Sequence, residues 1–302
     1  MPVKVQNGLP ARAVLEKENI FLMDENRAMT QDIRPLRILI LNLMPLKEDT
    51  ETQLLRSLSN TPLQLELELM RMSSHESTHT SSSHLNTFYK TFSQVALLHY
   101  DGMIITGAPV EKLEFEQVDY WDELCMIMDW STTHVTSVIH ICWGAQAGLY
   151  HHYGIPKYEL PAKLSGIYTQ RVLDRLVPLV RGFDDIFPAP HSRYTGNRRE
   201  DIAGCSELLL LAESEEAGPF LVMNRDGSRI FIMGHPEYDR ETLRQEYERD
   251  RDRGLDPQIP CNYFEDDDPK KPVQLSWRVH ANTLYTNWLN YYVYQRTPYE
   301  WY

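Results

Sequence analysis

The segment from residue 138 to residue 148 constrains the fold more than any other part of this 302-residue chain. An apolar run, Val138-Ile139-His140-Ile141, leads into Cys142, and glycine or alanine then stands at positions 144, 145, 147 and 148. Such a run is typical of a buried strand, and the small residues allow a tight turn followed by a closely packed helix. The segment therefore predicts a strand that turns sharply into a helix, with a thiol at the turn.

Strands and helices alternate over the first half of the chain. Residues 63–70 alternate apolar with acidic side chains, which predicts a strand at the sheet edge. This alternation indicates an α/β fold with a mainly parallel sheet flanked by helices. The hydrophobic pattern predicts further strands over 36–44, 103–105 and 136–141, and helices over 51–58 and 113–130.

The pattern changes after residue 160, where shorter apolar runs follow one another. Asp226-Gly227 predicts the turn of a hairpin over 219–233. We expect residues 36–302 to form a single domain, with residues 1–35 as an N-terminal extension packed on the core. The remaining expected elements are strands over 164–173, 177–181 and 206–212, and helices over 240–253 and 273–294.

The composition argues against several classes of protein. A formal charge of −13 argues against nucleic acid as the main partner. The longest apolar runs are far short of a membrane span, and the N-terminus lacks a signal-peptide core. Four widely spaced cysteines without a CxxC pair indicate free thiols in the cytoplasm. The histidines of the 73–84 stretch stand among serines and threonines without a recognisable set of metal ligands, so we expect a solvated loop and no metal.

Cys142, His235 and Glu237 form the candidate catalytic set. The second motif, Gly234-His235-Pro236-Glu237, follows an apolar run and places a histidine two residues from a carboxylate. A thiol, an imidazole and a carboxylate are what an activated thiol nucleophile needs. The other three cysteines lack such a context, and we expect them to be structural.

Backbone N–H groups near the thiol are candidate oxyanion donors. The N–H of Trp143, at the start of the predicted helix, would face an oxyanion formed on the attacked carbonyl. A second donor is expected from Gly107 or Ala108, because ligands of open α/β sheets bind at the carboxyl ends of the strands.

At this point the chain resembles the class I glutamine amidotransferases. Residues 141–146 resemble their nucleophile elbow, His235-Pro236-Glu237 their His-x-Glu pair, and residues 100–109 their oxyanion loop. The resemblance implies a class I glutamine amidotransferase-like (flavodoxin-like) fold. An amidotransferase delivers ammonia to a synthase, and no synthase is recognisable here, so a subunit serving a separate synthase stays an alternative. The intact triad argues against a non-enzymatic module.

A closer resemblance, to the amidotransferase-like homoserine O-acyltransferases of methionine biosynthesis, covers nearly the whole chain. It implies ping-pong acyl transfer from acyl-CoA to the γ-hydroxyl of L-homoserine, with acyl-CoA as co-substrate and no other cofactor. Cys142 would carry the acyl group as a thioester, His235 would act as the base and Glu237 would orient it. The motifs that carry the resemblance are residues 41–47, 106–111, 142–147 and 234–238.

The same resemblance places substrate-binding roles on Lys163, Ser192 and Arg249. Glu246 lies three residues before Arg249, so both face the same way on a helix. A carboxylate beside a guanidinium suits a zwitterionic amino acid, whereas the alternative is an ordinary intrahelical ion pair. Lys47 either reaches the sheet edge or is a surface lysine.

Glu111 bears on the acyl group. In this family glutamate at the matching position goes with acetyl donors and glycine with succinyl donors. Near the oxyanion loop, Glu111 would occupy space that a longer chain needs and would repel the distal carboxylate of succinate. We therefore predict a homoserine O-acetyltransferase that uses acetyl-CoA, with succinyl-CoA as the alternative.

The resemblance also implies a homodimer. The aromatic side chains near the C-terminus would help to form it, or would cap the core of a monomer instead. They are Tyr291, Tyr292, Tyr294, Tyr299, Trp301 and Tyr302.

Overall fold

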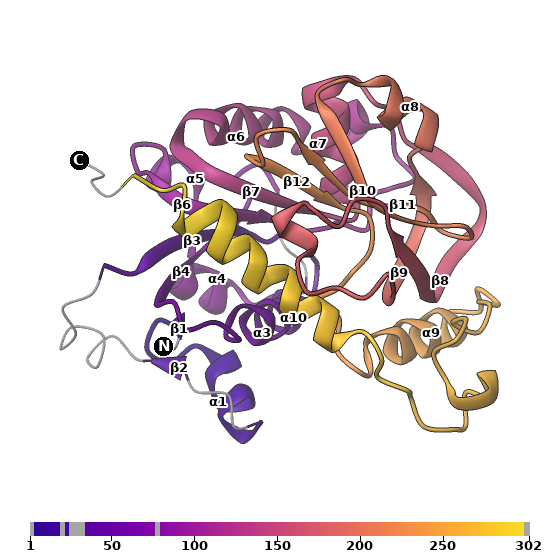
Figure 1. Cartoon of the computed structure of the whole chain (residues 1–302). Coiled ribbons are helices and arrows are strands. Elements are labelled where there is room, and N and C mark those ends of the chain that lie inside the picture. The colour runs from indigo at the N-terminus through magenta and orange to yellow at the C-terminus, as the bar shows by residue number, and fades with distance from the viewer. Residues whose placement is uncertain (1–2, 19–21, 24–33, 76–78, 299–302) are drawn as a thin grey trace.

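The computed structural model describes residues 3–18, 22–23, 34–75 and 79–298. Within these residues, 12 strands form one sheet in the order β2-β1-β4-β3-β6-β7-β12-β11-β10-β8-β9, with β5 (Tyr89–Lys90) paired to β4. Figure 1 shows helices on both sides of this sheet, with α10 crossing in front of the strands. Among the described residues, none of the helices combines the length and apolar character that a membrane crossing requires.

The parallel half of the sheet holds the predicted strands of the first half of the chain. Its strands are β3 (Leu36–Leu41), β4 (Leu65–Met70), β6 (Tyr100–Ile105), β7 (Val135–Ile141) and β12 (Arg229–Ile232). They pair in parallel with their neighbours β4–β3–β6–β7–β12. The helices that connect and cover them are α3 (Lys47–Leu58), α4 (Ser82–Phe88), α5 (Phe92–Val95), α6 (Trp121–His134) and α7 (Trp143–Tyr153).

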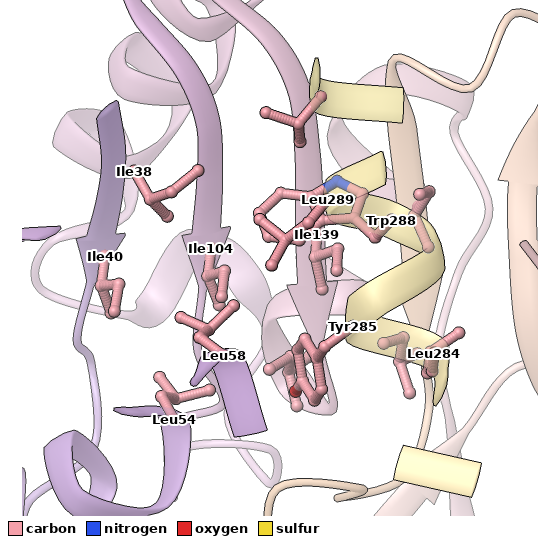
Figure 2. Close-up of a cluster of buried hydrophobic side chains, with 14 of the residues drawn as sticks. Ile38, Ile40, Leu54, Leu58, Ile104, Ile139, Leu284, Tyr285, Trp288 and Leu289 are labelled. Atoms are coloured by element: carbon pink, nitrogen blue, oxygen red, sulfur yellow. The ribbon is translucent and has the colours of Figure 1, made fainter. Parts of the chain in front are cut away.

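These strands are buried on both faces, because successive side chains enter different cores. Ile38 and Ile40 of β3 lie in one cluster with Leu54 of α3 and Trp288, whereas Leu39 lies in a second cluster with residues of α6. Figure 2 shows the first cluster between the strands and the helices α3 and α10 (Arg278–Asn287). The near-continuous apolar runs of the sequence are explained by this double burial.

The antiparallel half follows the change of pattern at residue 160. β8 (Tyr158–Val172) pairs with β9 (Ile186–Gly196), and β10 (Leu208–Ser214) pairs with β8 and with β11 (Gly218–Asn224). The predicted hairpin is confirmed as β11 and β12, joined through Gly227 at φ 70°. The helices of this half are α8 (Arg199–Gly204) and α9 (Thr242–Asp252).

Several boundaries and two elements differ from the sequence-based expectations. The strand expected at 177–181 is a 3-10 turn, Pro178–Val180, since the proline lacks an N–H for a ladder. β9, which carries two prolines, was not expected as a strand. The helix expected over 113–130 is a short 3-10 turn, Phe115–Gln117, followed by α6, which starts at Trp121. The last helix starts at Arg278 and ends in a π-helical segment, Trp288–Tyr294.

The N-terminal region adds to the sheet. β1 (Val3–Lys4) pairs with β4 and with β2 (Leu22–Met23), and α1 (Pro10–Lys17) packs against α3. β4 is therefore an interior strand, and its prediction as an edge strand is wrong because β1 occupies that side. Tyr292 lies in the core near the other end of the chain, whereas Tyr294 is exposed. Tyr299, Trp301 and Tyr302 lie outside the described residues, and the homodimer remains a prediction.

Candidate active site

The parallel strands bring the predicted catalytic segments to one edge of the sheet. Leu41 pairs with Ile105, and Ile141 pairs with Ile232, so β3, β6, β7 and β12 end at nearly the same level. The residues that follow these strands therefore meet there. Gly107 comes after β6, Cys142 after β7 and His235 after β12.

Cys142 sits at the sharp strand-to-helix turn predicted from the sequence. Its φ of 51° and ψ of −116° are strained for a residue with a side chain, at a cost on the order of 1–3 kcal/mol. Its N–H donates to the carbonyl of Ile232 at 2.7 Å, and α7 begins at the next residue. A Cβ at Gly144 would lie 2.5 Å from the carbonyl oxygen of Thr106, so only glycine lets the helix approach this closely. The turn thus holds the sulfur at the N-terminus of α7, which is the positive end of the helix dipole.

His235 and Glu237 complete the triad. His235 Nδ1 lies 2.7 Å from Glu237 Oε1, and both side chains are buried, as is Cys142. Burial alone would lower the pKa of His235, but the facing charges of Cys142 and Glu237 outweigh it and hold this pKa well above its usual range. The geometry brings a thiol, an imidazole and a carboxylate together, which is the arrangement of an activated cysteine nucleophile.

The predicted oxyanion donors surround the same sulfur. A Cβ built on Gly107 would lie 3.3 Å from Cys142 Cβ and 3.5 Å from His235 Cε1, so the Gly107 backbone is next to both. Ala108 lines the same cavity. The side chain of Trp143 is fully buried, but its N–H belongs to the first turn of α7, whose N–H groups have no partner within the helix. These backbone groups are placed for an oxyanion beside the thiol.

A cavity of about 270 Å³ opens onto this triad, and the predicted substrate residues line it. Glu111 comes from the loop after β6, Lys163 from β8 and Ser192 from β9. Glu246 and Arg249 both come from α9, as their spacing predicted. The other residues of its wall are Met44, Pro45, Gly107, Ala108, Pro109, Val110, Lys112, Leu113, Cys142, Tyr194, His235 and Tyr238.

Glu246 is the centre of a polar network in this cavity. Its carboxylate accepts hydrogen bonds from Tyr238 Oη at 2.9 Å, from Ser192 Oγ and from Lys163 Nζ at 3.4 Å. Lys163 Nζ also donates to Asp250 Oδ2 at 2.9 Å. Burial would lower the pKa of Lys163, but Glu246 and Asp250 outweigh it, and this pKa is raised. The network holds a charged amine beside a carboxylate at one end of the cavity.

Arg249 forms its ion pair with its neighbour, not with Glu246. Its Nε and Nη2 donate to Asp250 Oδ1 at 3.0 and 2.8 Å, and its side chain remains 45% exposed. The alternative of an ordinary intrahelical ion pair is therefore observed for Arg249, with Asp250 of the same helix as the partner, although Arg249 also lines the cavity together with Glu246.

Glu111 and Lys47 occupy different environments. Burial raises the pKa of the Glu111 carboxyl, opposed by His235 and Lys163. Lys47 is buried rather than at the surface, and its Nζ donates to the carbonyls of Asn42 and Met44. Burial lowers the pKa of Lys47 to about 8. Lys47 therefore does not line the cavity but holds the loop whose Met44 does.

Sequence reasoning missed three aromatic or charged neighbours. Tyr238 stacks on the His235 ring at 4.1 Å between centroids, and it lies in the same motif as His235. Tyr194 lies two residues after Ser192 on β9, so the period of a strand would have found it. Asp250 adjoins Arg249, but only the fold shows that it also binds Lys163.

The histidine-rich stretch is only in part the loop that was expected. His84 lies on α4, is buried and contacts Glu51 Oε1 at 2.9 Å through Nε2. Among the described residues, the groups close enough to share a metal ion are Asp129, His151 and His152, which do not line the cavity.

Comparison with known proteins adds a family and a fold. A family model described as homoserine O-succinyltransferase matches residues 2–299. Relatives named homoserine O-acetyltransferase include one from Lachnospira eligens, 63% identical over 99% of this chain and 97% of its own length. Those from Brevibacillus brevis and Clostridium acetobutylicum are 58% and 57% identical over 99% of this chain and 98% and 100% of theirs.

Solved structures with the same architecture are far more distant in sequence. A glutamine amidotransferase from Thermotoga maritima superposes with a TM-score of 0.57 at 12% identity, covering 85% of this chain and 98% of that one. One from Methylobacillus flagellatus gives 0.54 at 13% identity, covering 90% and 99%. At this identity the likeness extends to the fold alone, and it confirms the class I glutamine amidotransferase-like architecture.

Proposed function

The chain belongs to the homoserine O-succinyltransferase family, and we propose that within this family it is a homoserine O-acetyltransferase. It is an acyltransferase that acts on homoserine in methionine biosynthesis, and the donor is acetyl-CoA. The family name gives succinyl as the acyl group and the relatives' names give acetyl, so the choice of donor rests on the residues that line the cavity.

The position of Glu111 carries the choice of acetyl. This residue lines the same cavity as Cys142 and Gly107, which is where the acyl group must lie during attack. A two-carbon acyl group fits beside the glutamate, whereas the succinyl chain would compete with it for space. Where Glu111 is ionised it would also repel the distal carboxylate of succinate, and its burial makes that repulsion stronger than in water. Even when it is protonated, its volume remains.

The first half-reaction loads the thiol. The Cys142 thiolate attacks the thioester carbonyl, the Cys142 S–C bond forms, and the carbonyl oxygen takes the negative charge. The N–H groups of Trp143 and Gly107 or Ala108 stabilise that oxyanion. The C–S bond to CoA then breaks, and His235 gives its proton to the departing sulfur.

The second half-reaction transfers the acetyl group to homoserine. His235, now neutral, takes the proton of the γ-hydroxyl as the hydroxyl oxygen attacks the acetyl-Cys142 carbonyl. Collapse of the intermediate breaks the S–C bond, releases O-acetyl-L-homoserine and regenerates the thiolate–imidazolium pair. Glu237, at 2.7 Å from Nδ1, orients the imidazole in both steps.

The polar end of the cavity suits the amino-acid substrate. Arg249 offers a guanidinium to the carboxylate, and such pairs are often bidentate. Glu246 offers a carboxylate to the α-amino group, and Ser192 Oγ lies against Glu246. The positive charge of Lys163 offsets the negative charges of Glu246 and Asp250, to both of which its Nζ donates a hydrogen bond.

Mass spectrometry of the Cys142 peptide tests the proposal. Incubation with acetyl-CoA, without homoserine, should place one acetyl group on Cys142, and addition of homoserine should remove it. Faster transfer to homoserine from succinyl-CoA than from acetyl-CoA would contradict the choice of donor. A glutamyl adduct formed from glutamine would instead identify an amidotransferase subunit.

Two variants separate the size of Glu111 from its charge. Glu111→Gly should shift the preference toward succinyl-CoA, because both obstacles are removed. Glu111→Gln keeps the volume and removes the charge, so it should shift the preference less. Equal preferences in both variants and the wild type would remove this explanation.

The four cysteines are free, as predicted, which suits a reducing compartment. We therefore propose a cytoplasmic location. Immunodetection of the tagged chain in fractionated cells would check it.

A further inference from the structure

Arg193 is a buried cation that the proposed mechanism does not use. It lies on β9, is 3% exposed, and has no carboxylate within ion-pair distance among the described residues. Its guanidinium donates instead to the carbonyls of Thr195, at 2.6 Å, and Ala217, and its Nε lies 3.4 Å from His191 Nδ1. Burying a charge without a counter-charge costs several kcal/mol per ion. A residue that carries this cost has a function besides packing.

The position of Arg193 points to the nucleophile. It directly follows Ser192, whose carbonyl oxygen lies 3.9 Å from Cys142 Sγ. Gln146, in the first turns of α7, donates to the same Thr195 carbonyl at 3.1 Å and accepts from Thr195 Oγ1 at 2.8 Å. The guanidinium is therefore tied to the helix turn that starts at Cys142.

The charges around Cys142 explain why a second cation is useful. Carboxylates line or adjoin the cavity on several sides, and each of them disfavours a thiolate. His235 compensates these charges only while it is protonated, and it loses its proton as the pH rises through its pKa. His191 stays neutral, because burial first and then Arg193 hold its pKa well below the usual range. The titratable groups that face this region are Glu111, Lys163, Tyr168, His191, Arg193, His235, Glu237, Tyr238 and Glu246.

We propose that Arg193 is a positioning residue that stabilises the thiolate form of Cys142 through its permanent buried charge. An arginine keeps its proton across the working pH range, so its field persists at pH values where His235 is neutral. Burial lowers the pKa of Arg193 to about 10, and the Cys142 thiolate is the charge that most opposes this shift. The inference depends on Cys142 being the nucleophile and not on which acyl donor it meets.

The pH profile of Cys142 alkylation tests this role. Iodoacetamide reacts with the thiolate, which forms an S–C bond and expels iodide, so the rate reports the fraction of thiolate. In Arg193→Met the midpoint of the profile should move up by about one pH unit, which slows alkylation near neutral pH about tenfold. Arg193→Lys should stay within about threefold of the wild type. Gln170→Leu, which disturbs the same buried cluster beside His191 without removing a charge, is the matched control and should leave the midpoint in place.

Stability measurements separate this role from a structural one. In Arg193→Met the Thr195 carbonyl keeps its Gln146 donor, and the loss of the donor to the Ala217 carbonyl is offset by removal of a buried charge without a carboxylate partner, so thermal stability should be largely retained while the midpoint moves. If Arg193→Met lowered the thermal stability and left the midpoint of the alkylation profile unchanged, Arg193 would only hold β9 in place. That result would overturn the proposal. Should Arg193→Met not fold, Arg193→Gln supplies a neutral side chain that still donates a hydrogen bond, and the same midpoint decides.

Discussion

The two halves of the sheet contribute different things to one cavity. The parallel half supplies the thiol, the oxyanion backbone and the histidine, all on loops that follow strands buried on both faces. The antiparallel half and α9 supply charged or polar side chains, among them Lys163, Ser192 and Glu246. The parallel half positions atoms by backbone register, whereas the other half positions them through a network of hydrogen bonds.

On the proposed function, the parallel half carries the reacting groups and, through Glu111, the choice of acyl donor, whereas the other half and α9 hold homoserine. The fold is shared with glutamine amidotransferases at 12–13% identity, so the sheet edge can persist while the rest of the sequence changes. The Glu246 network depends on individual side chains from three elements. We therefore expect changes in the parallel half to lower turnover and changes in the antiparallel half to weaken homoserine binding.

The largest expected effect is the loss of the nucleophile. Cys142→Ala should lower kcat about 10⁴-fold or more, because no covalent intermediate can form. Circular dichroism should show an intact fold, since the helix turn keeps its glycine. A variant that kept a tenth of the wild-type rate would break the comparison, because the parallel half would then not supply the reacting atom.

The next effect concerns the orienting carboxylate. Glu237→Gln should lower kcat about 10² to 10³-fold, because His235 loses the partner that orients it. His235 has a raised pKa, so the wild-type imidazolium persists through neutral pH and is lost only as pH rises through that pKa. Without the Glu237 charge this pKa falls, and the alkaline limb of the pH–rate profile should move to lower pH. If the alkaline limb of the pH–rate profile of Glu237→Gln stayed at the wild-type pH, Glu237 would not raise the pKa of His235.

A change in the antiparallel half and α9 should behave differently. Arg249→Lys should raise the KM for homoserine about tenfold, because a lysine cannot form the bidentate pair with a carboxylate. The rate of Cys142 acetylation without homoserine should change less than threefold. Arg251→Lys on the same helix, where the arginine pairs with Asp252 outside the cavity, is the control. If Arg249→Lys slowed Cys142 acetylation as much as it slowed acetyl transfer to homoserine, the proposed division of roles between the two halves of the sheet would be wrong.

The smallest expected effect is on stability, at the loop after β3. Lys47 titrates near pH 8 in the folded chain and near 10.5 in the unfolded one. Between these values the unfolded chain binds more protons, so Lys47 makes stability rise with pH. Urea unfolding at pH 8 and 10 should show the wild type gaining about 1 to 2 kcal/mol relative to Lys47→Met. If the difference in unfolding free energy between the wild type and Lys47→Met were the same at pH 8 and pH 10, the pKa of Lys47 would not be lowered in the folded chain.

The fold and the chemistry were predictable where the signal is local. The apolar run before Cys142, the glycine at 144 and the spacing of His235 and Glu237 each describe backbone within a few residues. Strand β9 was missed because its prolines argue against a strand, although it pairs with β8 along most of its length. The edge position of residues 63–70 was wrong because the strand that covers it lies some 60 residues away in the sequence.

The sequence by itself determined the thiol turn, the mainly parallel α/β class and the candidate triad, because short-range periodicity and turn chemistry depend on neighbouring residues. Only the tertiary structure decided that Lys47 is buried, that Arg249 pairs with Asp250, and that Arg193 has no carboxylate partner among the residues that the structure describes. Those properties depend on which distant groups share a volume from which water is excluded. Burial sets the energy of a charge, and burial is a property of the assembled chain.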